Sequence, residues 1–433
     1  VLNDLASELS IPSSSFGTAG IKDSWAVTCQ EVTVRNITEF QLYEAAKHKP
    51  HIQISHVEKC DLPFFPGQLG GNLFRLRIRH LPEGTTKRNI DEAFGSLRDR
   101  GFVNYIGLQR FGKGGVRSEA VGLAYLRKDY ATAIDCILRP EAINAQNGQR
   151  SRPPRPWEAA WERTWNASTA LKAGVPPQLW VERCILMRLA QCQLHQQFDN
   201  QMTPDGAVAS KHTSVSKRKH ASGDEDNVED ENEQTEWDRV CRDAFLALPR
   251  SIRDLYAHAY CDRLWNLAAS DRVRRYGFGV VKGDLMLESH QKDGSKVQTP
   301  RLAKFDGDGS PFDIVLPRIG CDAKLPDHAV ATTLRQYLAY DSISLDDGLS
   351  IELRRDGKLR YLTPNYRRVF TRPRHLDWRC FDNDNEIECG STSNARDVKT
   401  VETVFALGPG QYATILMREL CAQRKLGERK PAH

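Results

Sequence analysis

The segment NLFRLRIRHL, residues 72–81, alternates between apolar and polar side chains, and this pattern strongly restricts how the chain can fold. Phe74, Leu76 and Ile78 would share one face of a strand, and the arginines between them would share the other. Since a period of two is typical of a half-buried strand, the segment predicts a sheet with one face against a core. Residues 400–420, TVETVFALGPGQYATILMREL, also predict a strand, which leads into a helix.

Between these two segments the apolar spacing changes to that of helices. Apolar residues recur at intervals of three and four over residues 178–197 and 237–276, with an interruption at Pro249, and residues 280–362 are mixed. Because the chain leaves a sheet and returns to it, we expect an α+β fold with a large insertion. Near the start, VRNITEFQLYEA (residues 34–45) predicts a further strand.

Residues 201–236 contain almost no large apolar side chains. A basic run, KRKH at residues 217–220, precedes an acidic run at residues 224–236. This composition is typical of a disordered polar loop. The basic run is compatible with nucleic-acid binding, with a sorting signal and with a simply solvated loop.

The net charge of +5 conceals a strongly basic body. The acidic run holds eight carboxylates, so the rest of the chain carries +13. A body this basic favours a polyanion such as RNA or DNA as partner, although a solvated basic surface is the alternative.

Composition excludes several classes of protein. The 433 residues are 40% hydrophobic, which indicates a globular protein, and no apolar run reaches the roughly 18 residues of a membrane span. Eleven cysteines and twelve histidines are scattered singly, so we expect no metal site and no disulfide framework. Reduced thiols favour an intracellular, reducing compartment, with mitochondrion, nucleus and cytoplasm left open. The opening VLNDLASELSIP matches the end of a helix, so we expect the sequence to begin inside a domain.

Four glycine-containing stretches combine small residues with polar and aromatic ones, as backbone close to a ligand often does. They are GIKDSWAVTCQ (20–30), GQLGGNLFRLRIR (67–79), GFVNYIGLQRFGKGG (101–115) and LGPGQYATILMREL (407–420). GKGG lacks the Lys-Ser/Thr ending of a Walker motif, which argues against a nucleotide-dependent enzyme.

Together and in this order, the four stretches resemble the motifs of the TruD-type pseudouridine synthases. The family patterns are G-x-K-D-[basic]-x-A-x-T-x-Q, G-N-x-F, N-Y-F-G-x-Q-R-F-G and P-[AP]-G-x-[YF]-A-T-x-x-x-R-E. The resemblance implies the pseudouridine synthase fold, a central mixed or antiparallel sheet flanked by helices. It further implies that residues 1–112 and 365–433 form a bipartite catalytic domain and residues 113–364 a helix-rich insertion, with the loop 201–236 inside it.

The resemblance also implies the activity, which is isomerisation of uridine to pseudouridine in tRNA or rRNA without cofactor or metal. Asp23, in the K-D motif, inherits the role of the indispensable aspartate. An ionised carboxylate held against the sugar can attack the anomeric carbon or remove a proton there. Lys22, beside it, is predicted to contact the substrate.

A uridine within an RNA helix must be flipped out and held by stacking. Phe74 matches the family's stacking aromatic, although the alternation alone favours an ordinary core residue. Asn72 matches a residue beside the pocket, and its alternative is a turn residue after two glycines.

The third motif supplies four further candidates for RNA contact: Asn104, Tyr105, Gln109 and Arg110. Arginine and glutamine on a glycine-bounded turn suit phosphate or base contacts. The alternative for Arg110 is an ion pair with a structural carboxylate. Arg75, Arg77 and Arg79 suit backbone phosphates or a solvated face.

The sequence departs from the family patterns at three positions. Ser24 replaces a basic residue, Val103 a proline and Ile106 a phenylalanine. The segment that gives the family's aspartate a basic partner is expected upstream of Val1. The competing interpretation is therefore an RNA-binding structural factor, for example in ribosome assembly or another ribonucleoprotein, that keeps the fold with little or no catalysis.

Overall fold

A computed structural model of the chain describes residues 1–20, 22–23, 25–112, 115–140, 152–202, 235–287, 300–345, 349–353, 357–381 and 398–427. These residues divide into two compact units. Unit 1 comprises Val1–Phe102 and Arg372–His433, and unit 2 comprises Val103–Thr371. The domain boundaries predicted from the sequence fall after residue 112 and before residue 365, and they stay a prediction.

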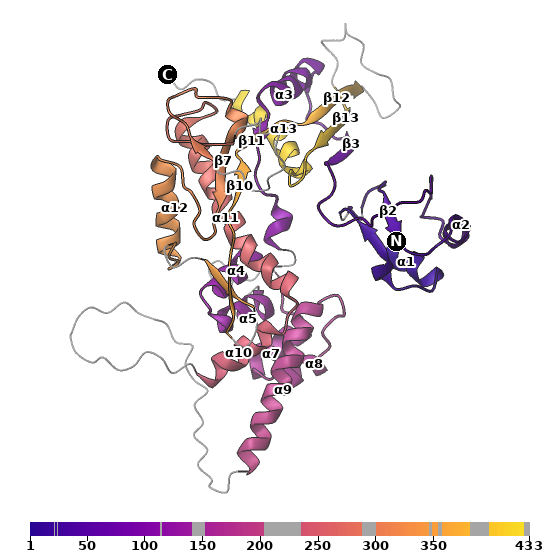
Figure 1. Cartoon of the computed structure of the whole chain (residues 1–433), viewed down its shortest axis with the longest axis vertical. Coiled ribbons are helices and arrows are strands. Elements are labelled where there is room, and N and C mark those ends of the chain that lie inside the picture. The colour runs from indigo at the N-terminus through magenta and orange to yellow at the C-terminus, as the bar shows by residue number, and fades with distance from the viewer. Residues whose placement is uncertain are drawn as a thin grey trace, which may run out of the picture. The chain divides into compact units, whose positions relative to one another are not determined.

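Unit 1 contains a three-stranded antiparallel sheet made from both ends of the chain (Figure 1). Its strand order is β12 (Arg374–Phe381), β13 (Thr400–Leu407), β3 (Asn72–Ile78). The predicted strands at residues 72–81 and 400–407 are therefore confirmed. The helix predicted after the second is α13 (Ala413–Gly427).

Helix α3 (Lys87–Arg100), which the sequence patterns did not predict, supplies the core on one face of this sheet. Phe94 on α3 packs with Cys380 and Val401 of the strands and with Leu420 of α13. Phe94 and Trp378 of β12 stack with their ring centroids 5.0 Å apart. Val401 pairs with Ile78, so the face of β3 that carries Phe74, Leu76 and Ile78 is the one on the side of α3.

The first part of unit 1 corrects one prediction, because residues 34–45 are not a strand. β1 (Phe16–Thr18) pairs with β2 (Val32–Val34), which ends at Val34, and α2 (Glu39–Lys47) follows. Thr38 caps α2: its Oγ1 accepts the N–H of Gln41, and the Gln41 side chain accepts the N–H of Thr38 at 2.9 Å. This capping box satisfies two N–H groups and selects a helix over an extended chain. The remaining elements of this part are α1 (Leu2–Glu8) and η1 (Ser13–Ser15).

Unit 2 is mainly helical in its first half, as predicted (Figure 1). Its elements there are η2 (Leu108–Phe111), α4 (Ser118–Leu126), α5 (Tyr130–Leu138), α7 (Pro156–Thr164), α8 (Ala167–Lys172), α9 (Trp180–Met202), α10 (Glu236–Leu246) and α11 (Arg250–Tyr276). Pro249 immediately precedes α11, where its missing N–H costs nothing. The predicted loop 201–236 lies outside the described residues, except that residues 201–202 end α9 and residues 235–236 begin the α10 region.

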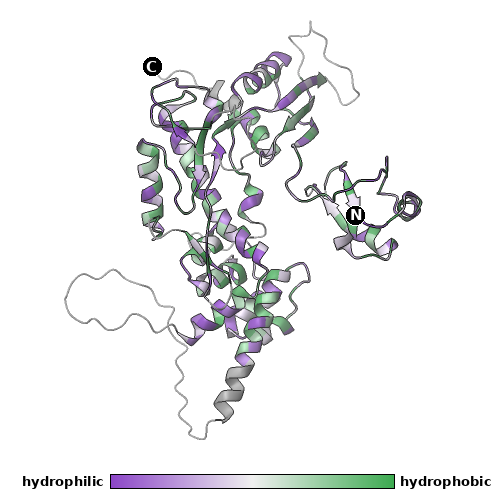
Figure 2. Ribbon diagram, in the orientation of Figure 1, coloured by the Kyte–Doolittle hydropathy of each residue, from purple (hydrophilic) through white to green (hydrophobic). Residues whose placement is uncertain are grey.

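The helices α4 and α11 form the central contact of this unit. Gly122 permits it, because a Cβ there would lie 2.0 Å from the carbonyl oxygen of Tyr256 on α11. Hydrophobic residues concentrate around α4, α5 and α7 (Figure 2), where Trp157, Trp161 and Phe245 are at most 1% exposed. Burial of these large rings supplies much of the hydrophobic stabilisation of unit 2.

The second half of unit 2 contains a four-stranded antiparallel sheet of order β10–β7–β5–β6. The elements of this half of unit 2 are β5 (Leu285–Met286), β6 (Arg301–Leu302), η3 (Pro311–Asp313), β7 (Ile314–Arg318), α12 (Ala329–Tyr340), β8 (Ser350–Glu352), β9 (Leu359–Tyr361), β10 (Asn365–Arg368) and β11 (Phe370–Thr371). The short β4 (Phe102–Val103) lies where unit 1 ends and unit 2 begins. Trp265 of α11 anchors the sheet to the helix, since its Nε1 donates to the carbonyl of Leu316 at 3.1 Å. In the described residues, no helix is long and apolar enough to cross a membrane.

Candidate functional site

The K-D motif contacts the start of β3 through one side-chain pair. Lys22 donates a hydrogen bond from Nζ to Oδ1 of Asn72, the first residue of the strand. Asp23, the next residue, is exposed, and its carboxylate accepts the N–H of Trp25 at 3.0 Å. The first and second motifs are therefore in contact, and the predicted catalytic residue, Asp23, is the next residue after the Lys22 that makes this contact.

The second and fourth motifs also meet, at Gly71. A Cβ at this position would lie 2.2 Å from the carbonyl oxygen of Leu407, the residue that pairs with Asn72. Gly71 has a φ of 142°, which side chains rarely adopt. Only glycine therefore allows β3 to begin so close to the end of β13, and this explains the glycine of G-N-x-F.

Phe74 lies on the same face of β3 as Asn72, two residues further on. It is half-buried and stacks on Phe405, its partner in the ladder, with ring centroids 5.4 Å apart and planes 23° apart. Phe405 itself is fully buried. One face of the Phe74 ring thus rests on a rigid support, an arrangement compatible with both a base-stacking role and a core role.

The opposite face of β3 carries the three arginines. Arg75 and Arg79 are exposed, while Arg77 pairs with Glu402 of β13 at 3.2 Å. Arg374, at the start of β12, was not singled out from the sequence, and its Nη2 donates to the carbonyl of Gly70 at 2.8 Å. Of these arginines, Arg374 thus contacts the residues just before β3, whereas the charge of Arg77 is paired with Glu402.

The third motif belongs to unit 2 from Val103 onward, and Asn104 is 5% exposed there. Its Nδ2 donates to the carbonyl of Arg368 at 3.1 Å, and its N–H donates to that of Val369 at 2.8 Å. Arg367 donates to both oxygens of Asn104, from Nη2 to Oδ1 at 2.7 Å and from Nε to the backbone oxygen at 2.9 Å. The polar atoms of Asn104 thus hold the third motif against β10 and the residue that follows it.

Helix α11 holds the rest of this motif with polar residues spaced four apart. Asn266 accepts the N–H of Ile106 at 2.8 Å and donates to its carbonyl at 3.0 Å. Ser270, one turn later, lies 3.0 Å from the hydroxyl of Tyr105. The sequence patterns did not identify these residues, although polar side chains every fourth position in a mainly buried helix were the available signal.

Asp262, one turn before Asn266, accepts Nε of Arg110 at 2.6 Å and also pairs with Arg318 of β7. The ion pair with a buried carboxylate, which the sequence left open for Arg110, is thus present. Gln109, at the tip of the same turn, is exposed. Of the departures from the family pattern, Val103 lies in β4 and Ile106 is 4% exposed, whereas Ser24 lies outside the described residues.

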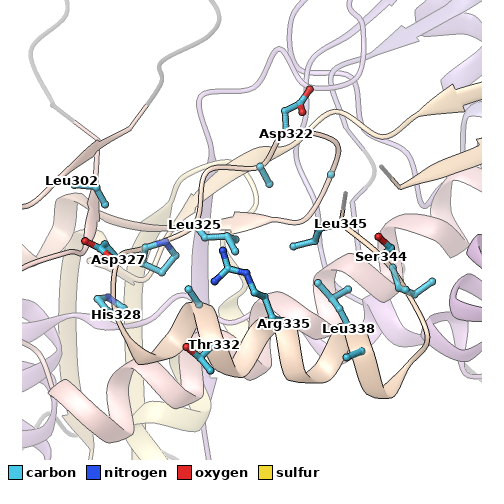
Figure 3. A pocket seen from close by; sticks show the side chains of 16 residues that line it. Leu302, Asp322, Leu325, Asp327, His328, Thr332, Arg335, Leu338, Ser344 and Leu345 are labelled. Carbon is cyan, nitrogen blue, oxygen red and sulfur yellow. The ribbon is translucent and has the colours of Figure 1, made fainter. Parts of the chain in front are cut away.

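A separate cavity of about 930 Å³ lies in unit 2 between α12 and the loop 320–328 (Figure 3). Thr332, Arg335 and Leu338 of α12 form one wall, and the Arg335 guanidinium reaches toward Leu325 in the loop. None of the residues predicted to act on RNA lines this cavity.

His328, at the edge of this cavity, belongs to a buried ionic cluster. Its Nε2 lies 3.1 Å from Oδ1 of Asp284, which also forms a pair with Arg272 at 2.6 Å. Burial alone would raise the pKa of Asp284, but hydrogen bonds from Arg272, His328 and the N–H of Val281 outweigh it and hold this pKa below its ordinary value. The cluster joins α11 to the residues that immediately precede β5 and α12, and so serves the stability of unit 2.

Comparison with known proteins shows which class of protein has this fold. The fold is similar to that of the solved structure of the putative tRNA pseudouridine synthase D (TruD) from Methanosarcina mazei, with a TM-score of 0.58. The two are 16% identical, and the likeness covers 97% of this chain and 84% of that one. The predicted fold class, α+β with an antiparallel sheet and a helical region, is confirmed.

The family model "tRNA pseudouridine synthase D (TruD)" matches residues 1–217 and 228–420, so the chain belongs to this family. The Pseudouridylate synthase 7 homolog of Mus musculus is 26% identical over 435 residues, covering 97% of this chain and 56% of the relative. Pseudouridylate synthase PUS7L of Homo sapiens is 27% identical, with 96% and 54% covered. Multisubstrate pseudouridine synthase 7 of Schizosaccharomyces pombe is 25% identical, with 96% and 59% covered. The chain thus spans a little over half the length of these relatives.

Proposed function

We propose that this protein is an RNA pseudouridine synthase, an isomerase that converts uridine to pseudouridine within an RNA chain. Membership of the TruD family supports the proposal, because the matched residues contain all four motifs. The relatives from mouse, human and fission yeast all carry the name of this activity.

The observation that carries the proposal is the contact between Lys22 and Asn72. It joins the loop of Asp23 to the strand that presents Phe74. A carboxylate and a supported aromatic ring are the two groups that a flipped uridine requires. We propose that Asp23 acts on the sugar, Phe74 stacks on the base, and Lys22 and Asn72 bind beside them.

The chemistry needs only a carboxylate and a closed site. The bond between N1 and C1′ breaks, the base turns, and C5 bonds to C1′; the proton lost from C5 is balanced by one gained at N1. The carboxylate of Asp23 attacks C1′ or removes a proton from the sugar to start this sequence. We propose no cofactor and no metal for the reaction.

We propose a divided role for the third motif. Gln109 and Arg110, at the tip of its turn, contact the RNA, whereas Asn104 and Tyr105 keep the turn in place through their bonds to β10 and α11. A loop held this firmly presents its tip with little loss of entropy on binding. The bipartite catalytic domain of residues 1–112 and 365–433, with the insertion at 113–364, is part of this proposal.

The proposed substrate is structured RNA, either tRNA or rRNA, alone or within a ribonucleoprotein assembly. The description of the family names tRNA, and the fission yeast relative is described as multisubstrate. We propose an intracellular, reducing compartment. The free thiols of ten cysteines in the described part of the chain are compatible with it.

The decisive experiment incubates the protein with unmodified tRNA and rRNA transcripts and measures pseudouridine by mass spectrometry. The wild type should form pseudouridine, and Asp23→Asn should abolish its formation while leaving RNA binding intact. Asp61→Asn, which removes another exposed carboxylate of unit 1, is the matched control and should retain activity.

Absence of modification by the wild type on every transcript would contradict the enzyme proposal. If the wild type also bound RNA and an Asp23→Asn protein fully replaced it in cells, the RNA-binding structural factor would be the better description.

A further inference from the structure

Arg110 and Arg318 are brought together by one buried carboxylate. Arg110 comes from η2 in the third motif and Arg318 from the end of β7, some two hundred residues later in the chain. Each donates its Nε to a different oxygen of Asp262, which is 3% exposed. The tertiary structure, and no local pattern, therefore creates this pair.

The charges in the cluster do not cancel. Two guanidinium groups share one carboxylate, which leaves one net positive charge at the site. His258, one turn before Asp262 on α11, adds no charge at neutral pH, because burial lowers its pKa and the nearby Arg318 and Arg110 lower it further. An uncompensated charge in a half-buried place favours an anion.

The geometry also leaves donors available. Both arginine side chains are 25% exposed. Within the part of the chain that the structure describes, neither guanidinium makes a hydrogen bond through its Nη atoms. Since the Nε atoms are fixed on Asp262, the planes of both groups are oriented before any ligand arrives. A pair of oriented guanidinium groups suits the oxygens of a phosphate.

We infer that Arg110 and Arg318, oriented by Asp262, form a binding site for one phosphodiester group of the RNA. The inference rests on the proposed function and deepens it by assigning an RNA contact to unit 2. Exposed Leu108 and Gln109 lie in the same turn, so a phosphate held here would bring its neighbouring nucleotide beside them. Asp262 is a positioning residue, because it acts through the two arginines.

The test measures RNA binding, with turnover recorded in parallel. The affinity of a fluorescent, unmodified tRNA transcript is determined by anisotropy at several salt concentrations between about 50 and 200 mM. Arg318→Gln should weaken binding about tenfold at the lowest salt, and should reduce the slope of log affinity against log salt by about one. Arg110→Gln should behave in the same way. Both proteins should remain folded, because the remaining arginine still neutralises Asp262.

Two further variants sharpen the result. Arg88→Gln, on α3, removes an arginine that is paired one-to-one with Glu92 and 77% exposed, and it should leave affinity and slope unchanged. Arg318→Lys keeps a charge for Asp262 but loses the planar fork, so it should weaken binding nearly as much as Arg318→Gln.

Wild-type affinity in Arg318→Lys, or an unchanged salt slope in either glutamine variant, would overturn the phosphate site while leaving the proposed enzyme intact if turnover persists. Failure of the wild type to bind the transcript at all would overturn both the site and the proposed function.

Discussion

Gly71 offers the sharpest test of how the motifs are assembled, because its neighbour provides a matched control. In Gly71→Ala the new Cβ would lie 2.2 Å from the carbonyl oxygen of Leu407, and the φ of 142° would be strained. In Gly70→Ala the new Cβ has no atom within 4 Å. The two variants change the same atoms one residue apart and should differ strongly.

The cost of Gly71→Ala follows from two effects. An alanine at this φ is strained by about 1–3 kcal/mol. Relief of the clash must also separate the start of β3 from the end of β13, which loses a backbone hydrogen bond worth about 1 kcal/mol. The free energy of unfolding of unit 1 should therefore fall by about 2–4 kcal/mol, and its Tm by roughly 5–10 °C.

Activity should fall with the stability, because Asn72 follows Gly71 and holds Lys22. We expect kcat/KM for pseudouridine formation to decrease at least about tenfold even below the Tm of the variant. Thermal unfolding followed by near-UV circular dichroism, together with a timed modification assay, measures both effects. Equal Tm and equal activity for the two alanine variants would refute the close approach of the second and fourth motifs.

Three further predictions concern other parts of the molecule. Phe74→Ala should reduce pseudouridine formation by about tenfold to a hundredfold, because it removes the stacking surface for the base, while costing unit 1 about 1–2 kcal/mol. Truncation of the fully buried Phe405 should cost about 3–5 kcal/mol, as chemical denaturation would show. Gly122→Ala should destabilise unit 2 by more than about 2 kcal/mol, because the new methyl group forces α4 away from α11. Gly95→Ala is its control: the Cβ enters open space on α3 and should stabilise unit 1 by about 0.5–1 kcal/mol. The carboxyl of Asp284 has a lowered pKa in the folded protein. The ionised carboxylate therefore stabilises the fold above the ordinary pKa of an aspartate, about 3.9, and this stabilisation is lost as the pH falls below that value. Asp284→Asn should lower the Tm at pH 7 and flatten the acid side of a Tm-against-pH curve.

Each of these predictions has an outcome that contradicts it. If Phe74→Ala unfolds unit 1 as completely as truncation of Phe405, then Phe74 is a core residue and its stacking assignment is wrong. A stable Gly122→Ala protein would contradict the close packing of the two helices. A Tm-against-pH curve for Asp284→Asn that parallels the wild-type curve would contradict the depressed pKa.

The sequence determined the elements whose patterns are local. The alternation at residues 72–81 defined β3, and the apolar spacing defined α9 and α11. The pattern failed at residues 34–45, where the capping box of Thr38 and Gln41 outweighed the apparent strand character. Period and propensity are properties of neighbouring residues, so they can be read without the fold, whereas a capping bond requires the helix to exist.

The order of the motifs identified the candidate residues. It did not identify the residues that they contact in the folded protein. The sequence left Arg110 either an RNA contact or a structural pair, and the structure shows it paired with Asp262 beside Arg318. No pattern near Arg110 in the sequence predicts that Asp262 and Arg318 lie beside it.

The sequence by itself thus determined the family, the strand that carries Phe74 and the carboxylate to be tested first. Only the tertiary structure decided why Gly71 must be glycine, which residues hold the third motif, and where charge remains uncompensated. The physical reason is that clashes, shared carboxylates and buried donors depend on distances between residues far apart in the chain. Those distances are set by packing and pairing, as in the approach of β3 to β13 and of η2 to α11.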